Sequence, residues 1–90
     1  MNTESIKCRR VESGKIERAG DFCFDDERET IYLWMPGMTG PDAISIEVGK
    51  QGGERVWAWD GDEENPTLTP SLHVPGTWHG FLRRGMLESC

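Results

Sequence analysis

Ser71 and His79 are the residues whose types and spacing could perform catalysis. Both lie in the stretch PTLTPSLHVPGTWHGFLRRG, which begins at Pro66, ends at Gly85 and holds both histidines of the chain. A serine hydroxyl is a weak nucleophile until a neighbouring base accepts its proton. Imidazole is the side chain that most often acts as a general base near neutral pH. The pair therefore predicts the nucleophilic catalysis of a small serine hydrolase or peptidase.

Three residues near the pair are predicted to bind the substrate: Trp78, Gly80 and His73. Trp78, next to His79, is the tryptophan expected to line a pocket. Gly76 and Gly80 leave backbone amides unshielded, and such amides can form an oxyanion hole. The chain has no GxSxG elbow. An ordinary stretch of β-sheet, with a serine and a histidine that have no catalytic role, is therefore the alternative interpretation.

A metal site is a further hypothesis for the same region. His73, His79 and Cys90 could supply three ligands, with Cys23 or an acidic residue as the fourth. Zinc sites usually show short paired spacings, such as CxxC or HExxH. Here the successive candidates are six and eleven residues apart. We therefore expect no metal and no cofactor, and we name these three residues as the ligands if a metal binds.

The formal net charge of the 90-residue chain is −6. Phosphate contacts need clustered Lys and Arg side chains, so this charge argues against nucleic acid as the direct ligand. It permits a basic protein surface as the partner. An acidic binding protein that uses Asp60, Asp62, Glu63 and Glu64 is therefore the alternative to an enzyme. In both cases the expected partner is a protein, either a substrate or a host protein.

The cysteines and the apolar segments indicate the compartment. The chain has three cysteines, an odd number, and no CxxC pair, so reduced thiols are expected. The first twenty residues are charged and lack the apolar run of a signal peptide. No apolar stretch approaches the roughly 20 residues that span a bilayer. We therefore expect a soluble cytoplasmic protein that does not contact a membrane.

The elements that must position Ser71 and His79 are short strands. Apolar and polar residues alternate along most of the chain, and Gly or Pro clusters interrupt the alternation. Strands are expected at residues 21–24, 30–35, 43–48, 54–60, 67–74, 78–82 and 86–89. The prediction is an all-β fold, a small antiparallel sandwich or partly open barrel of about seven short strands. Residues 1–18 would form an N-terminal arm or short hairpin, and residues 19–90 a single β domain.

The turn between Ser71 and His79 determines whether the two side chains meet. A proline-set bend at Pro70 could aim the Ser71 hydroxyl away from the sheet, and Pro70 also places its strand at an edge or on a bulge. Strand pairing across the segment HVPGT can then bring His79 near Ser71. The segments WHGFL and MLES flank RRG and are expected to form a closing hairpin.

The same motifs carry a resemblance to a known family. The segments NPTLTPSLHV and WHGFLRRGMLESC, with GDFCF, MPG and WAWDGDEENPTLTPS before them, follow the order of a small domain found in phages and prophages. This family is often mislabelled as ammonia monooxygenase. It is similar to BubE, the peptidase of bacterial ubiquitin-like conjugation operons. The resemblance covers residues 19–90, and its most specific parts are PTLTPS and HG.

The resemblance implies a serine-type peptidase that acts on a ubiquitin-like protein. Ser71 would be the nucleophile and His79 the base. For a phage-borne member, the alternative that it implies is an inhibitor that binds a host defence component without cutting it.

Overall fold

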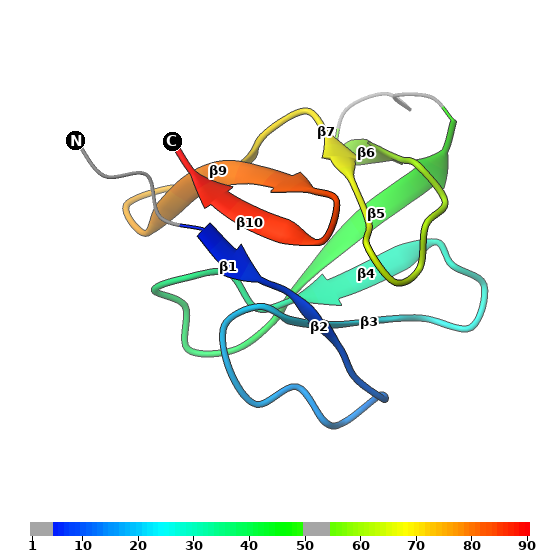
Figure 1. Cartoon of the computed structure of the whole chain (residues 1–90), viewed down its shortest axis with the longest axis horizontal. Coiled ribbons are helices and arrows are strands. Elements are labelled where there is room, and N and C mark those ends of the chain that lie inside the picture. Colours follow the sequence, from blue (N-terminus) through cyan, green and yellow to red (C-terminus); the bar gives the residue numbers. More distant parts are fainter. Residues whose placement is uncertain (1–4, 50–54) are drawn as a thin grey trace.

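The computed structural model describes residues 5–49 and 55–90, which form strands in two sheets and no helix (Figure 1). The strands are β1 (Ser5–Lys7), β2 (Arg9–Arg10), β3 (Asp21–Phe24), β4 (Thr30–Leu33), β5 (Asp42–Val48), β6 (Val56–Trp59), β7 (Leu68–Thr69), β8 (Leu72–Val74), β9 (Trp78–Arg83) and β10 (Met86–Ser89). The expected all-β fold is confirmed. In the described residues, no helix is long and apolar enough to cross a membrane.

The chain crosses from one sheet to the other at two points. The four-stranded sheet has the order β1-β10-β9-β8, and the six-stranded sheet has the order β2-β3-β4-β5-β6-β7. The first crossing is at Cys8, between β1 and β2. The second is at Pro70 and Ser71, between β7 and β8. Pro70 therefore separates two edge strands, because a residue without an N–H cannot continue a ladder. The expected strand at residues 67–74 is divided here.

Not all of the pairing is antiparallel. β2 pairs in parallel with β3, and β5 pairs in parallel with β6. In the second case β6 starts beside the middle of β5 and ends beside its last residue, since Ser45 lies opposite Val56 and Val48 opposite Trp59. The other six strand pairs are antiparallel, as the sequence predicts, and these two parallel pairs were not foreseen.

One apolar core lies between the sheets. β5 shows why these residues form strands: Ile44 and Ile46 are buried, whereas Ser45 and Glu47 are exposed. Leu82 and Leu87 face the core from the four-stranded sheet. The buried residues of this core are Cys8, Phe22, Phe24, Ile31, Leu33, Met35, Ile44, Ile46, Trp59, Leu68, Leu72, Leu82 and Leu87.

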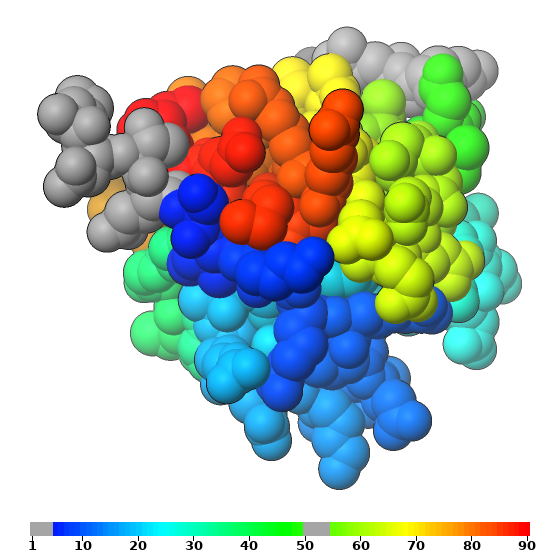
Figure 2. Space-filling view, in the orientation of Figure 1, coloured from blue at the N-terminus to red at the C-terminus, as the bar shows by residue number. Residues whose placement is uncertain are grey.

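The N-terminal strands join the two sheets. β1 pairs with β10 and β2 with β3, although both strands lie in the segment for which the sequence predicts an arm or hairpin. The Cys8 amide, between them, donates to the Gly85 carbonyl over 2.8 Å. Figure 2 shows this blue segment lying against the orange and red β9 and β10. The buried Asp21 accepts hydrogen bonds of 3.0 and 2.8 Å from the Arg9 guanidinium.

Candidate active site

The Ser71 hydroxyl oxygen lies 3.1 Å from Nε2 of His79. Ser71 directly precedes β8, and His79 is the second residue of β9. The antiparallel register pairs Leu72 with Gly80 and His73 with His79, so Ser71 and His79 are diagonal neighbours on one face. This separation is within the range over which a base can accept the proton of a nucleophile. The expected hairpin therefore brings the two side chains together.

The contact allows the hydroxyl to donate its proton to the imidazole. A neutral imidazole carries one proton, so a ring that accepts at Nε2 carries its proton on Nδ1. In the described residues, no hydrogen bond to Nδ1 of His79 is seen. His73 is instead its close neighbour, with ring centroids 4.9 Å apart and planes tilted by 46°. The arrangement is a serine–histidine pair with a second imidazole beside it.

The pair lies on the outer, solvent-exposed face of the four-stranded sheet. His73 and His79 are exposed, and Ser71 is partly exposed. Phe81 and Arg83 follow His79 at every second residue and so share its face. The Arg83 guanidinium lies 3.9 Å from the centre of the Phe81 ring and forms a 3.2 Å ion pair with Glu88. Water and an extended substrate therefore have direct access to the hydroxyl.

The backbone at Ser71 is held from the other sheet. Nε1 of Trp57, on β6, donates a hydrogen bond of 3.1 Å to the Ser71 carbonyl oxygen. On either side of the crossing, Leu68 and Leu72 are both buried in the core, with 2% exposure. Trp57 is not among the site residues expected from the sequence. The available signal was its indole N–H, which needs an acceptor when the ring is half-buried.

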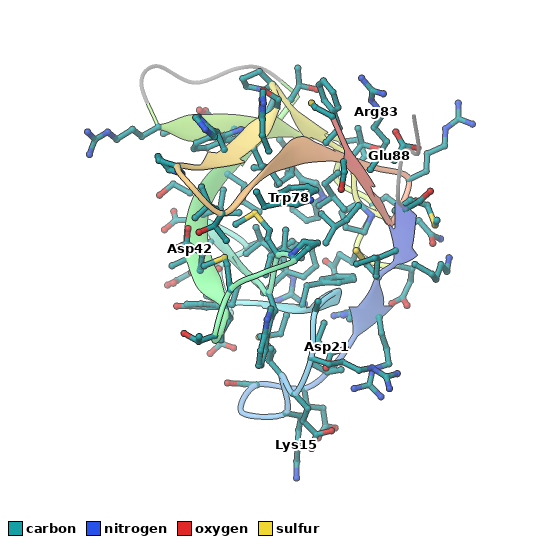
Figure 3. All side chains as sticks on the ribbon, turned by 90° about the vertical axis from the view of Figure 1, so that its left-hand side faces the viewer. Lys15, Asp21, Asp42, Trp78, Arg83 and Glu88 are labelled. Carbon is teal, nitrogen blue, oxygen red and sulfur yellow. The ribbon has the colours of Figure 1, made fainter. Side chains whose placement is uncertain are left out.

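Trp78 and Gly80 point to the opposite face from His79. Nε1 of Trp78 donates to the Ser89 hydroxyl over 2.8 Å, and its ring packs against the core. A side chain at Gly80 would collide with the Trp78 ring and with the Glu88 carbonyl, so only glycine leaves room for the indole. Figure 3 shows Trp78 inside the molecule, with Arg83 and Glu88 at its surface. A substrate contact by Trp78 or Gly80 stays a prediction.

The two glycine amides predicted for an oxyanion hole do not meet at Ser71. The Cys90 amide donates to the His79 carbonyl over 3.0 Å, so the backbone of His79 bonds toward β10. Consecutive residues of a central strand bond alternately to its two neighbours, so Gly80 bonds toward Leu72 of β8. Gly76 lies five residues beyond Ser71, in the loop between β8 and β9.

The candidate metal ligands His73, His79 and Cys90 do not form a compact set. Among the described residues, the one group of three whose ligand atoms all lie within 4.8 Å of one another is Asp25, Glu27 and Glu29. The Asp25 carboxylate already accepts hydrogen bonds from the backbone amides of Glu29 and Thr30. The Asp25 carboxylate therefore closes a turn. All three cysteines are free, with Cys8 and Cys23 buried and Cys90 exposed.

The acidic loop that precedes Ser71 is engaged in internal contacts. Asp60 accepts hydrogen bonds from the amides of Asp62 and Thr67, and Asp62 from those of Glu64 and Asn65. The four acidic side chains of the alternative binding surface therefore shape this loop or pair with arginines.

Two arginines neutralise the end of this loop. Glu63 lies 3.0 Å from Arg28 and 3.1 Å from Arg10, and Glu64 lies 2.6 Å from Arg10. The hydrogen bond from Arg28 is the main reason that the pKa of Glu63 is lowered.

One of the three comparisons with known proteins identifies the family of the chain. No curated protein and no solved structure matches the chain. The family model described as "Bacterial ubiquitination-like system serine protease (BubE)" matches residues 8–90. The match includes Ser71, His79 and every strand from β2 to β10. The chain therefore belongs to the BubE family of serine proteases of bacterial ubiquitination-like systems.

Proposed function

We propose that the protein cleaves peptide bonds with Ser71 as the nucleophile and His79 as the general base. The observation that carries this proposal is the 3.1 Å contact between the Ser71 hydroxyl and Nε2 of His79. The family is described as serine proteases, and a serine protease needs a hydroxyl whose proton a base can accept. Among the described residues, Ser71 is the one whose hydroxyl forms a hydrogen bond with the His79 ring, which makes it the nucleophile that we propose.

In the first half of the reaction, the Ser71 oxygen attacks the carbonyl carbon of the scissile peptide bond. His79 takes the hydroxyl proton at Nε2 as the new C–O bond forms. The tetrahedral intermediate collapses when the C–N bond breaks. The same proton passes from Nε2 to the leaving amine, and an acyl ester remains on Ser71.

In the second half, a water molecule replaces the leaving amine. His79 accepts a proton from this water, whose oxygen attacks the ester carbonyl. Collapse of the second intermediate returns the proton to the Ser71 oxygen and releases the carboxylic acid product. The exposed position of His79 gives water direct access to Nε2.

The substrate that we propose is a ubiquitin-like protein. The family name places its members in a ubiquitination-like system, where a protease can process a ubiquitin-like precursor. The position of the pair on the outer face of the sheet supports a protein substrate, since a small molecule is usually bound in a concave pocket.

Substitution of the two residues tests the assignment. Ser71→Ala and His79→Ala should each abolish cleavage of a ubiquitin-like precursor, and the double variant should be no worse than either, because residues of one catalytic unit are not additive. A fluorophosphonate probe should label the wild-type protein and neither single variant. The melting temperature should barely change, because both side chains lie on the outer face of the sheet. Full activity of Ser71→Ala would contradict the assignment.

A further inference from the structure

β8 is the terminal strand of the four-stranded sheet, and Ser71 directly precedes it. In the described part of the chain, β9 is the strand that pairs with it, and its other edge has no strand partner. The free edge of a terminal strand presents backbone N–H and C=O groups that can pair with another chain. Here that edge begins beside the nucleophile.

The register shows which backbone groups point to the free edge. Gly80 bonds toward Leu72, as derived above from the bond between Cys90 and His79. By the alternation of an antiparallel ladder, the backbone of His73 then points away from β9, and so does that of Ser71. The 4.9 Å separation of the His73 and His79 rings agrees, because side chains are closest across a pair that exchanges no backbone hydrogen bonds.

One of these edge groups is already occupied. The Ser71 carbonyl accepts the hydrogen bond from Trp57. Three groups remain at the edge: the Ser71 N–H, the His73 N–H and the His73 carbonyl. Among the described residues, none of the three has a hydrogen-bond partner. The Ser71 N–H is a donor beside the proposed nucleophile. Two residues further on, His73 offers a donor, its N–H, and an acceptor, its carbonyl.

We infer that an extended segment of the protein substrate binds along β8 as an added strand. The inference rests on the proposed function, and it assigns the substrate backbone as the group recognised. A peptide residue opposite His73 would exchange two hydrogen bonds with its backbone, as in other cases of strand addition. In this antiparallel pairing, the substrate carbonyl two residues further along the peptide lies opposite the Ser71 N–H. That N–H then stabilises the oxyanion, a role in which the amide of a nucleophilic serine serves elsewhere.

The length of the edge favours a peptide tail over a second copy of the protein. β8 has three residues, and Pro70 and Pro75 lie close to its two ends. Prolines and short edge strands limit pairing between sheets of two molecules. A flexible tail needs few backbone hydrogen bonds to β8, because the contact of its carbonyl group with Ser71 also contributes to binding. The occupant is therefore an unfolded segment of the ubiquitin-like substrate.

A matched pair of variants tests the His73 N–H. His73→Pro removes this N–H, and His73→Ala keeps it while removing the same imidazole. Proline is tolerated at an edge position whose N–H faces outward, and it favours the extended conformation that Leu72 already has. For a precursor-tail peptide, KM should be about fivefold higher in His73→Pro than in His73→Ala, the effect of one hydrogen bond. Labelling by a small fluorophosphonate, which has no peptide backbone, should proceed at the same rate in both.

The outcomes separate the inference from the proposed function. Equal KM values for the two variants, with normal labelling, would overturn strand addition and leave the protease intact. Absence of labelling and cleavage in the wild-type protein would instead overturn the proposed function. A third outcome is that wild type and His73→Ala dimerise, that His73→Pro does not, and that the two variants have equal KM values. This outcome would assign the edge to a second copy of the protein and reject the inference.

A second measurement avoids any effect of proline on folding. Wild-type protein is given a series of tail peptides, each N-methylated at one amide. Methylation of the residue opposite His73 should raise KM about fivefold, because the N–H of that residue donates to the His73 carbonyl. Its neighbours, whose amides point away from the edge in an extended peptide, should change KM little. A uniform response along the peptide would reject the register that we propose.

Discussion

At the scale of single residues, the Ser71 backbone depends on a side chain from the other sheet. The Trp57 indole holds the Ser71 carbonyl, so the nucleophile is attached to β6 as well as to its own strand. Catalysis is sensitive to small displacements of a reacting group. We therefore expect Trp57 to position the proposed nucleophile without contacting the reacting atoms.

Trp57→Phe should lower kcat/KM for a precursor peptide about tenfold, through a displaced hydroxyl. The loss of one hydrogen bond should lower the free energy of unfolding by about 1 kcal/mol. Trp34→Phe is the matched control, because Nε1 of Trp34 also donates to a backbone carbonyl, that of Met38, at 3.0 Å. The control should lose similar stability and keep its activity, as measured by chemical denaturation and by the fluorophosphonate labelling rate. Equal activity losses in the two variants would reject the positioning role.

The three thiols should differ sharply in reactivity. Burial raises the pKa of Cys8 to about 12, and burial also raises the pKa of Cys23. The reactive form of cysteine is the thiolate, so these two thiols should resist modification in the folded protein. At pH 8, a disulfide reagent should react rapidly with the exposed Cys90 alone, and with all three after denaturation. Cys90→Ser should remove the rapid phase. A rapid phase of two or three thiols would contradict this prediction.

At the scale of elements, Arg9 and Asp21 connect β2 to β3. Hydrogen bonds from Arg9 are the main reason that the pKa of Asp21 lies below its usual value, and the backbone amide of Glu17 adds to the effect. The Asp21 side chain is buried with 1% exposure. The ionised carboxylate therefore stabilises the attachment of the N-terminal strands, and its protonation should weaken it.

Asp21 should make the protein acid-sensitive. Its folded pKa is lower than its unfolded pKa of about 3.9, so its stabilising effect is complete above that value and is lost as the pH falls through the folded pKa. Between pH 7 and pH 2, the free energy of unfolding should fall more steeply in wild type than in Asp21→Asn, whose amide does not titrate. Urea denaturation at several pH values measures both slopes. Parallel curves would show that the pair contributes nothing.

The predictable elements were those whose own residues alternate. Each of the seven expected strand segments has a counterpart, apart from residue 54, which lies outside the described residues, because alternation or a run of β-branched and aromatic residues marks a strand locally. β1 and β2 have three and two residues in a polar, mixed-charge segment, so no period is visible in them. The two parallel pairs depend on which distant strand each one joins, and local alternation carries no information about that.

The contact between Ser71 and His79 was predictable from the sequence, whereas the positions of the other site residues were not. A three-residue turn after Val74 sets the hairpin register, and this register makes neighbours of Ser71 and His79. Adjacent residues of a strand point to opposite faces, so Trp78 and Gly80 lie across the sheet from His79. The hydrogen bond from Trp57 joins two sheets, and no spacing in the sequence indicates it.

At the scale of the whole molecule, Ser71 lies where the chain leaves one sheet and enters the other. Its carbonyl is held by the six-stranded sheet and its hydroxyl by a residue of the four-stranded sheet. A chain in which either half is misassembled would keep Ser71 and His79 but lose the contact between them. We therefore predict that proteolytic activity requires correct assembly of both sheets, so that a partly folded copy is inactive.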